Sequence, residues 1–85
     1  MPSAPLNELE LAVLDFEREW LNGPAVKEQA IRSQFGLSGA RYYQILGRLI
    51  ESPTALAYDP LLVRRLLRTR DERRERRAAR TRPID

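Results

Sequence analysis

The chain contains neither cysteine nor histidine. The lack of cysteine excludes disulfides, thiolate metal ligands and cysteine nucleophiles, and the lack of histidine removes the commonest general base and metal ligand. No stretch approaches the ~20 apolar residues of a membrane-spanning helix, and residues 1–5 lack the charged-then-apolar order of a secretion signal. We therefore expect a cytoplasmic protein with no zinc site, no histidine-dependent catalysis and no membrane partner.

The length and the acidic residues argue against an enzyme. A chain of 85 residues supports one small domain and no second one. Catalysis needs a pocket in which polar groups converge on a perturbed acid or base. Acidic pairs such as Asp71 and Glu72 instead lie in an arginine-rich stretch, where intrahelical ion pairs account for them. We expect a binding protein, not an enzyme, without a cofactor.

Charge is distributed unevenly along the chain. The net charge is +3, yet residues 1–22 hold five acids against one arginine, whereas residues 60–82 hold ten arginines against three acids. Guanidinium groups stay charged and match phosphate oxygens bidentately, so this surplus favours an anionic partner such as nucleic acid. A solvated basic helix without any ligand is the other interpretation of the same surplus.

Apolar spacing and cap residues predict an all-α fold, a small helical bundle. Asn7, with Glu10 as its capping-box partner, starts a helix that we place over residues 8–22. Its apolar stripe includes Phe16 and Trp20, which we assign to the core in preference to an exposed interaction patch. Pro24 begins a second helix over residues 24–35, which Gly36 ends. The expected apolar side of this second helix consists of Val26, Ala30, Ile31 and Phe35.

Ser38 is the expected N-cap of a third helix over residues 39–50. Tyr42, Ile45, Leu46, Leu49 and Ile50 gather on its apolar side, and Ala40, Arg41, Gln44, Gly47 and Arg48 on the opposite side. Tyr43 falls on the boundary between the two sides. Ser52-Pro53 and Asp59-Pro60 then predict a single helical turn around residues 54–57 and a last helix that begins at Pro60.

The last helix changes character along its length. It is amphipathic as far as Leu67, but no apolar residue occurs from Thr69 to Arg77. The later part therefore cannot belong to a core, and we expect a solvated helical extension there. We divide the chain into a flexible N-terminus (1–6), a helical domain with a helix-turn-helix (7–70) and an arginine-rich extension (71–85).

Residues 28–50 have the order of a helix-turn-helix, in which the second helix enters the major groove of DNA. Arg41 suits guanine, Gln44 suits adenine, and Arg48 suits a base or a phosphate one turn later. The predicted base-facing residues are Gly39, Ala40, Arg41, Tyr43, Gln44 and Arg48. The predicted phosphate contacts are Lys27, Arg32, Ser38, Arg64, Arg65, Arg68, Arg70, Arg73, Arg74 and Arg77. Arg32 stands where such motifs usually have a small residue, so either the helices cross differently or Ala30 makes the close contact.

Residues 14–20 (LDFEREW), 27–32 (KEQAIR), 38–44 (SGARYYQ), 49–50 (LI) and 59–66 (DPLLVRRL) carry a recognisable pattern. Together they resemble a family of small actinobacterial proteins catalogued as a domain of unknown function. The resemblance covers roughly residues 9–82, and its most specific part is residues 41–44 with the trailing arginine-rich helix. It implies a helix-turn-helix regulator or chromosome-associated protein of a high-GC bacterium. A weaker likeness links residues 28–50 to the promoter-reading helix-turn-helix of sigma factors.

We expect a DNA-binding protein, either a transcriptional regulator or a nucleoid-associated protein, with double-stranded DNA as its partner. Because the module has a small footprint, we also expect a homodimer or several copies along the duplex. The alternative is a protein-interaction module that docks on RNA polymerase or a sigma factor through the acidic first helix or the apolar part of the last helix. DNA binding is favoured if Arg41, Gln44 and Arg48 share a continuous basic surface with the last helix. The alternative is favoured if Glu17, Glu19 and Glu28 interrupt that surface.

Overall fold

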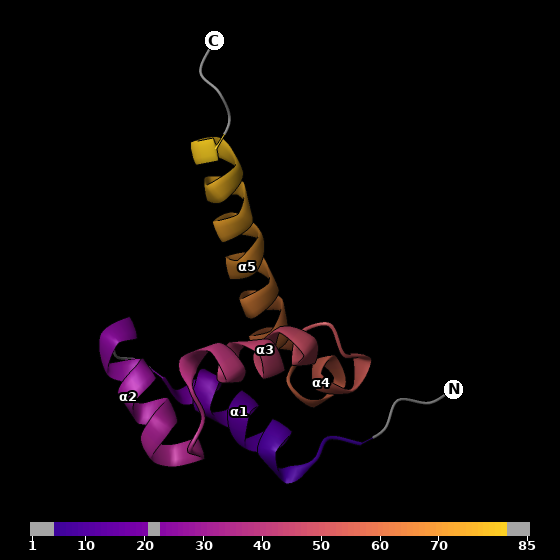
Figure 1. Ribbon diagram of the computed structural model, residues 1–85. Helices are drawn as coiled ribbons and strands as arrows, with labels where there is room; N and C mark the ends of the chain where they lie inside the picture. The colour runs from indigo at the N-terminus through magenta and orange to yellow at the C-terminus, as the bar shows by residue number, and fades with distance from the viewer. Residues whose placement is uncertain (1–4, 21–22, 82–85) are drawn as a thin grey trace.

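The computed structural model describes residues 5–20 and 23–81, which form five helices and no strand. They are α1 (Glu8–Glu19), α2 (Pro24–Phe35), α3 (Gly39–Leu49), α4 (Pro53–Tyr58) and α5 (Pro60–Thr81) (Figure 1). The predicted all-α fold is confirmed. None of the helices in this part of the chain is long and apolar enough to cross a membrane.

The helix boundaries follow the cap residues. The capping box at α1 is present, because Asn7 Oδ1 accepts the backbone N–H of Glu10 at 2.8 Å and Glu10 Oε1 accepts that of Asn7 at 2.9 Å. Gly36 closes α2 in the left-handed conformation, with φ of 66°. Ser38 caps α3 as predicted, its Oγ accepting the backbone N–H of Arg41 at 3.1 Å.

Two predicted boundaries differ from the structure. The first helix ends at Glu19 and not at residue 22, because Trp20 is already extended, with ψ of 122°. The expected last two residues of that helix, 21 and 22, lie outside the described residues. The third helix ends at Leu49, and Ile50 is its C-cap.

The core lies where α1, α3 and the first turns of α5 meet. Its buried apolar residues are Val13, Leu14, Phe16, Ile31, Tyr42, Leu46, Leu49, Ile50, Ala55, Leu62 and Val63. Aromatic rings hold α1, α2 and α3 together: the Phe16 ring lies 5.4 Å from that of Phe35 and 5.9 Å from that of Tyr42, both edge to face. This arrangement confirms the predicted apolar side of the third helix.

The prediction that Val26 belongs to the apolar, core-facing side of the second helix is wrong. Val26 is 56% exposed, whereas Ile31 on the same helix is completely buried. At 100° per residue the two side chains lie about 140° apart around the helix axis. The whole of the expected apolar side therefore cannot face the core at once. Ile31 faces the core, and Val26 faces solvent.

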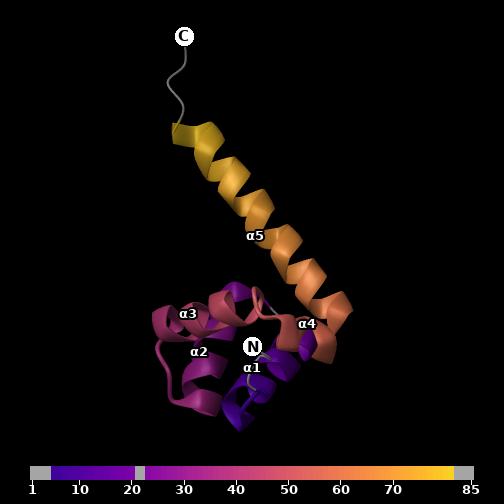
Figure 2. The same cartoon turned by 90° about the vertical axis from the view of Figure 1, so that its right-hand side faces the viewer.

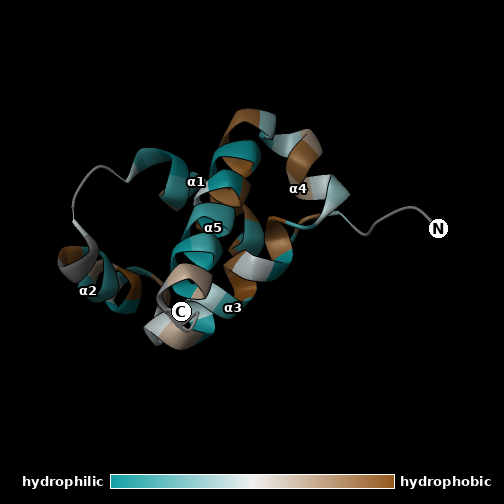
Figure 3. Cartoon of the chain, turned by 90° about the horizontal axis from the view of Figure 1, so that it is seen from above, coloured by the Kyte–Doolittle hydropathy of each residue, from teal (hydrophilic) through white to brown (hydrophobic). Residues whose placement is uncertain are grey.

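The last helix leaves the bundle. In Figures 1 and 2, α5 starts beside α4 and then projects away from the other helices. Leu62 and Val63 are buried, Leu66 and Leu67 are partly buried, and every side chain from residue 71 to residue 79 is exposed. With 22 residues, the helix is about 33 Å long. Figure 3 views the molecule from above, from the side of the C-terminal end of α5, and shows the apolar first turns of this helix and the hydrophilic turns that follow them. The last residues of the predicted arginine-rich extension, 82–85, lie outside the described residues.

Candidate nucleic-acid interface

The outer side of α3 presents polar side chains and no acid. Ala40, Arg41, Gln44 and Arg48 are all exposed. Arg41 Nη1 lies 3.4 Å from Gln44 Oε1, so these two side chains reach in the same direction from successive turns. No acidic residue occurs within Gly39–Leu49. We call Ala40, Arg41, Gln44 and Arg48 the α3 face.

Gly39, predicted to face a base, lies elsewhere. It is buried, and a Cβ at this position would come within 3.1 Å of Glu28 Oε1 and 3.4 Å of Glu28 Cγ. The missing side chain lets the Glu28 side chain of α2 pack directly on the start of α3. This is a close α2–α3 contact, made by a small residue on α3, while Arg32 on α2 stays exposed.

Next to the α3 face, a groove of about 360 Å³ runs between α3 and α5. Leu46, Ile50 and Leu66 supply apolar lining, and Tyr43 forms part of the wall on α3. The remaining lining residues are Glu17, Lys27, Gly47, Thr69, Arg70, Arg73, Arg74 and Arg77. We call this the α3–α5 groove. It brings the predicted base-facing Tyr43 together with four of the arginines predicted to contact phosphate.

A buried carboxylate lies at the inner end of this groove. Glu17 is 5% exposed, and both Nζ of Lys27 and the hydroxyl of Tyr42 donate hydrogen bonds to it. The Lys27 Nζ lies 2.7 Å from Glu17 Oε2 and 5.5 Å from the centre of the Tyr43 ring. Burial, and then the hydrogen bond to Glu17, raise the pKa of the Tyr42 hydroxyl far above its usual value of 10.

In this cluster, Lys27 and Glu17 have roles that differ from those expected from the sequence. Lys27, a predicted phosphate contact, is mostly buried and is the counter-ion of Glu17, so its charge is not available to a ligand. Glu17 was expected only as an acid that could interrupt a basic surface, yet it is buried and bonded to residues of α2, α3 and α5. Its position next to Phe16 and four residues after Val13 is the only signal of burial, and nothing in the spacing identifies Lys27 as its partner.

Two of the predicted phosphate contacts on α5 bind other parts of the bundle. Arg65 Nη2 donates to the backbone oxygen of Glu17 at 3.1 Å, and Arg70 Nη1 lies 2.7 Å from Glu51 Oε1. These two therefore help to fix α5 on the bundle. The other predicted phosphate contacts on this helix are exposed: Arg64, Arg68, Arg73, Arg74 and Arg77.

Of the three acids that could interrupt a basic surface, one is buried and one lies elsewhere. Glu17 is buried with its counter-ion, and Glu19 lines a different pocket, on α1 and α2. Glu28 is exposed and lies against Gly39, the first residue of α3. Gly47 lines the α3–α5 groove and lies one turn after Gln44 on α3, so the α3 face borders the groove there. Among residues 5–20 and 23–81 no cluster of acidic side chains could hold a metal ion.

The fold and this surface define a small all-α protein with a basic groove between its third helix and a projecting arginine-rich helix. The chain belongs to the family described as "protein of unknown function (DUF3263)", whose model matches residues 5–78. The match extends from the lead-in to α1 nearly to the end of α5, and it agrees with the resemblance to a domain of unknown function. Neither the curated proteins nor the solved structures contain a match.

Proposed function

We propose that this protein binds double-stranded DNA through a helix-turn-helix formed by α2 and α3, as a transcriptional regulator or nucleoid-associated protein of an actinobacterial cell. The observation that carries the proposal is the acid-free α3 face, which borders a groove lined by arginines of α5. Three residues separate α2 from α3, which is the short connection that such a motif needs.

The dimensions of the α3 face suit the major groove. Arg41 and Arg48 are seven residues apart, which is about 10.5 Å along the helix axis. With base pairs stacked every 3.4 Å, this distance spans about three base pairs. Gln44 lies between the two arginines and supplies the bidentate amide that matches adenine. In this proposal, Ala40, Arg41, Gln44 and Arg48 face the bases, with Tyr43 at the edge towards α5.

The outward-facing arginines of α5 supply the phosphate contacts. Arg73 and Arg74 line the groove from the side opposite α3, so a duplex that receives α3 brings its backbone towards them. Arg32 and the Ser38 cap lie at the turn, where a second stretch of backbone passes. Gly39 is left out because it is buried, and Lys27 because its charge is neutralised by Glu17.

The test is fluorescence anisotropy of a labelled random-sequence duplex at several salt concentrations. We expect the wild type to bind with a steep salt dependence, about 0.9 units of log–log slope for each neutralised phosphate. Arg73→Gln/Arg74→Gln should lower the slope by about 1.8 if each arginine contacts one phosphate. Arg18→Gln removes one positive charge from α1, away from the surface, and should leave the slope unchanged.

A second pair of substitutions separates base reading from backbone contact. Arg41→Gln/Arg48→Gln should weaken binding to selected high-affinity sequences more than binding to the random duplex, because base contacts carry the specificity. Equal losses on both would indicate a nucleoid-type binder with little specificity. Absence of binding at about 50 mM salt, where electrostatic contacts are strongest, would refute the proposal and favour the alternative, docking on RNA polymerase or a sigma factor.

A further inference from the structure

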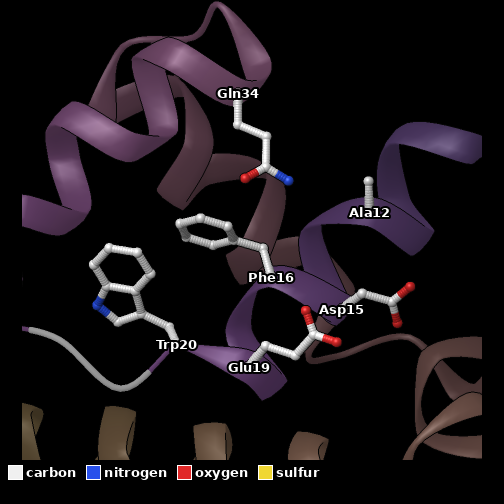
Figure 4. A pocket seen from close by; sticks show the side chains of 6 residues that line it. All are labelled: Ala12, Asp15, Phe16, Glu19, Trp20 and Gln34. Carbon is white, nitrogen blue, oxygen red and sulfur yellow. The ribbon is translucent and has the colours of Figure 1, made fainter.

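A second pocket, of about 380 Å³, lies between α1 and α2 (Figure 4). It is lined by Ala12, Asp15, Phe16, Glu19, Trp20 and Gln34, and by no residue of α3 or α5. Figure 4 shows the Phe16 and Trp20 rings next to each other, with the Glu19 carboxylate below them and the Gln34 amide above. The proposed DNA surface does not include this pocket.

The lining combines an aromatic wall with an unused carboxylate. The Phe16 and Trp20 rings are stacked, with centroids 5.1 Å apart and planes at 24°. Asp15 is already occupied, since its Oδ1 accepts from Arg18 at 2.9 Å and from the Tyr58 hydroxyl at 2.8 Å. Glu19 is exposed and forms no ion pair with another described residue. It therefore supplies the free negative charge of the pocket.

A planar cation fits this set of groups best. A guanidinium can lie against an aromatic face while its N–H groups reach a carboxylate and an amide oxygen, whereas a compact ammonium cannot do both equally well. The chemistry of the pocket thus selects an arginine side chain.

The chain itself carries such side chains on an exposed, projecting element. Every side chain from residue 71 to residue 79 on α5 is exposed, and this stretch contains Arg73, Arg74, Arg76 and Arg77. The same copy's α5 does not line the pocket, and its arginine-rich part extends away from the bundle (Figures 1 and 2). The α1–α2 pocket and the arginine-rich part of α5 are therefore complementary surfaces that lie apart in one copy.

We propose that the α1–α2 pocket binds an arginine of α5 from a second copy of this chain, so that copies associate head to tail. The two surfaces in contact are different, so the interface is heterologous, and each pair of copies keeps one free pocket and one free α5. Association continues into open chains or a ring. The contact is small and charged, so it weakens as salt increases. This inference is independent of the proposed DNA binding.

The experiment is analytical ultracentrifugation without DNA, over a range of protein concentrations at low and high salt. We expect the wild type to exceed its monomer mass of 9.9 kDa at low salt and to return towards it at high salt. Glu19→Lys should weaken association at least tenfold. Glu8→Lys makes the same charge change on α1 outside the pocket and should leave association close to that of the wild type.

A mixing experiment identifies the two surfaces. Arg73→Gln/Arg74→Gln/Arg76→Gln/Arg77→Gln removes the α5 charges but keeps residues that favour helix. We expect this variant and Glu19→Lys to be monomeric when alone and to form a heterodimer when mixed, because one provides an intact α5 and the other an intact pocket. Circular dichroism confirms that both are folded. The single tryptophan, Trp20, reports occupancy of the pocket by its fluorescence.

Three outcomes would overturn the inference. The first is a wild type that stays monomeric at low salt up to about millimolar concentration. The second is Glu19→Lys associating as strongly as Glu8→Lys. The third is a dimer that survives both high salt and loss of the α5 arginines, which would indicate a symmetric apolar contact through exposed residues such as Leu61. Loss of DNA binding alone would leave these results unchanged.

Discussion

At the scale of single residues, Glu17 is the residue that contacts side chains from three other helices. It receives hydrogen bonds from Lys27 on α2 and Tyr42 on α3, and its backbone oxygen accepts from Arg65 on α5. A buried charge is tolerated only when it is paired and hydrogen-bonded. The cluster therefore joins four helices at one point, and each partner has a defined effect on stability.

Removing the Tyr42 hydroxyl should lower the free energy of unfolding. Tyr42→Phe keeps the ring against Phe16 and Phe35 but leaves Glu17 with one donor fewer, and a hydrogen bond to a charged group contributes about 1.5–3 kcal/mol. Urea denaturation followed by circular dichroism measures the change. The control is Tyr43→Phe, because the Tyr43 ring is 45% exposed, and its effect should stay within about 0.5 kcal/mol. Equal effects of the two substitutions would contradict the assigned role of Tyr42.

The same hydroxyl predicts a dependence on alkaline pH. The pKa of Tyr42 is raised in the folded protein, whereas in the unfolded chain it is close to 10. The folded state keeps its proton when the unfolded chain loses it, so stability is unaffected below pH 10 and falls as the pH rises above it. The slope expected for one proton is about 1.4 kcal/mol per pH unit. The difference between wild type and Tyr42→Phe, measured from pH 9 to 11, isolates this contribution. A constant difference would contradict the prediction.

At the scale of elements, the connection between α2 and α3 depends on two glycines with different roles. Gly36 ends α2 in the left-handed region, which residues with a Cβ adopt at a cost. At Gly39 the limit is space instead, because a Cβ there would come within 3.1 Å of Glu28 Oε1 and the Glu28 side chain would have to shift. Both bring α3 close to α2, so the orientation of the α3 face depends on this turn.

A pair of glycine substitutions should change stability in opposite directions. Gly36→Ala places a Cβ at φ of 66° with no atom nearby, so only backbone strain acts, and we expect a loss of about 1–2 kcal/mol. Gly47→Ala lies inside α3 with open space around it, so better helix propensity should give a gain of about 0.5–1 kcal/mol. Thermal or urea denaturation tests both. A stabilising Gly36→Ala would mean that α2 does not end in the left-handed conformation.

At the scale of the whole molecule, charge is separated in space as well as in sequence. The acids of α1 that remain exposed lie on the bundle, and the surplus arginines lie on a helix that projects from it (Figure 2). Every side chain from residue 71 to residue 79 is exposed. Ion pairs at the surface contribute little to stability, so the fold itself gains little from this part of the helix.

The projection of α5 predicts the size of the molecule in solution. The Cα radius of gyration is 14.7 Å, whereas a compact chain of this length would have about 12 Å. Small-angle X-ray scattering at low protein concentration and high salt, where association is suppressed, should give the larger value. A value near 12 Å would show that α5 folds back on the bundle in solution. A concentration series separates this effect from self-association.

Much of the fold was predictable because its signals are local. The Asn7 and Ser38 caps, the Gly36 stop and the Pro60 start each depend on a few neighbouring residues, and they give the helix boundaries within a few residues. The errors occur where packing against other helices decides whether a residue is buried. Val26 has the residue type of a core position, but the direction in which α2 faces leaves it in solvent.

The site was predictable only in part, for the same reason. The exposed positions of Arg41, Gln44 and Arg48 follow from the period of α3, which is a property of one helix. The burial of Gly39 under Glu28 and the pairing of Lys27 with Glu17 involve two elements at once. Nothing in the order of residues states which helices will meet.

The sequence by itself determined the helical class, the caps, the outer side of α3 and the change of α5 from apolar to arginine-rich, because each depends on residue type and spacing within one helix. Only the tertiary structure decided that Glu17 is buried, that Tyr43 and the α5 arginines share a groove, and that Phe16, Trp20 and Glu19 form a pocket. These depend on the packing of helices far apart in the chain, where burial and pairing set the free energy of each charge.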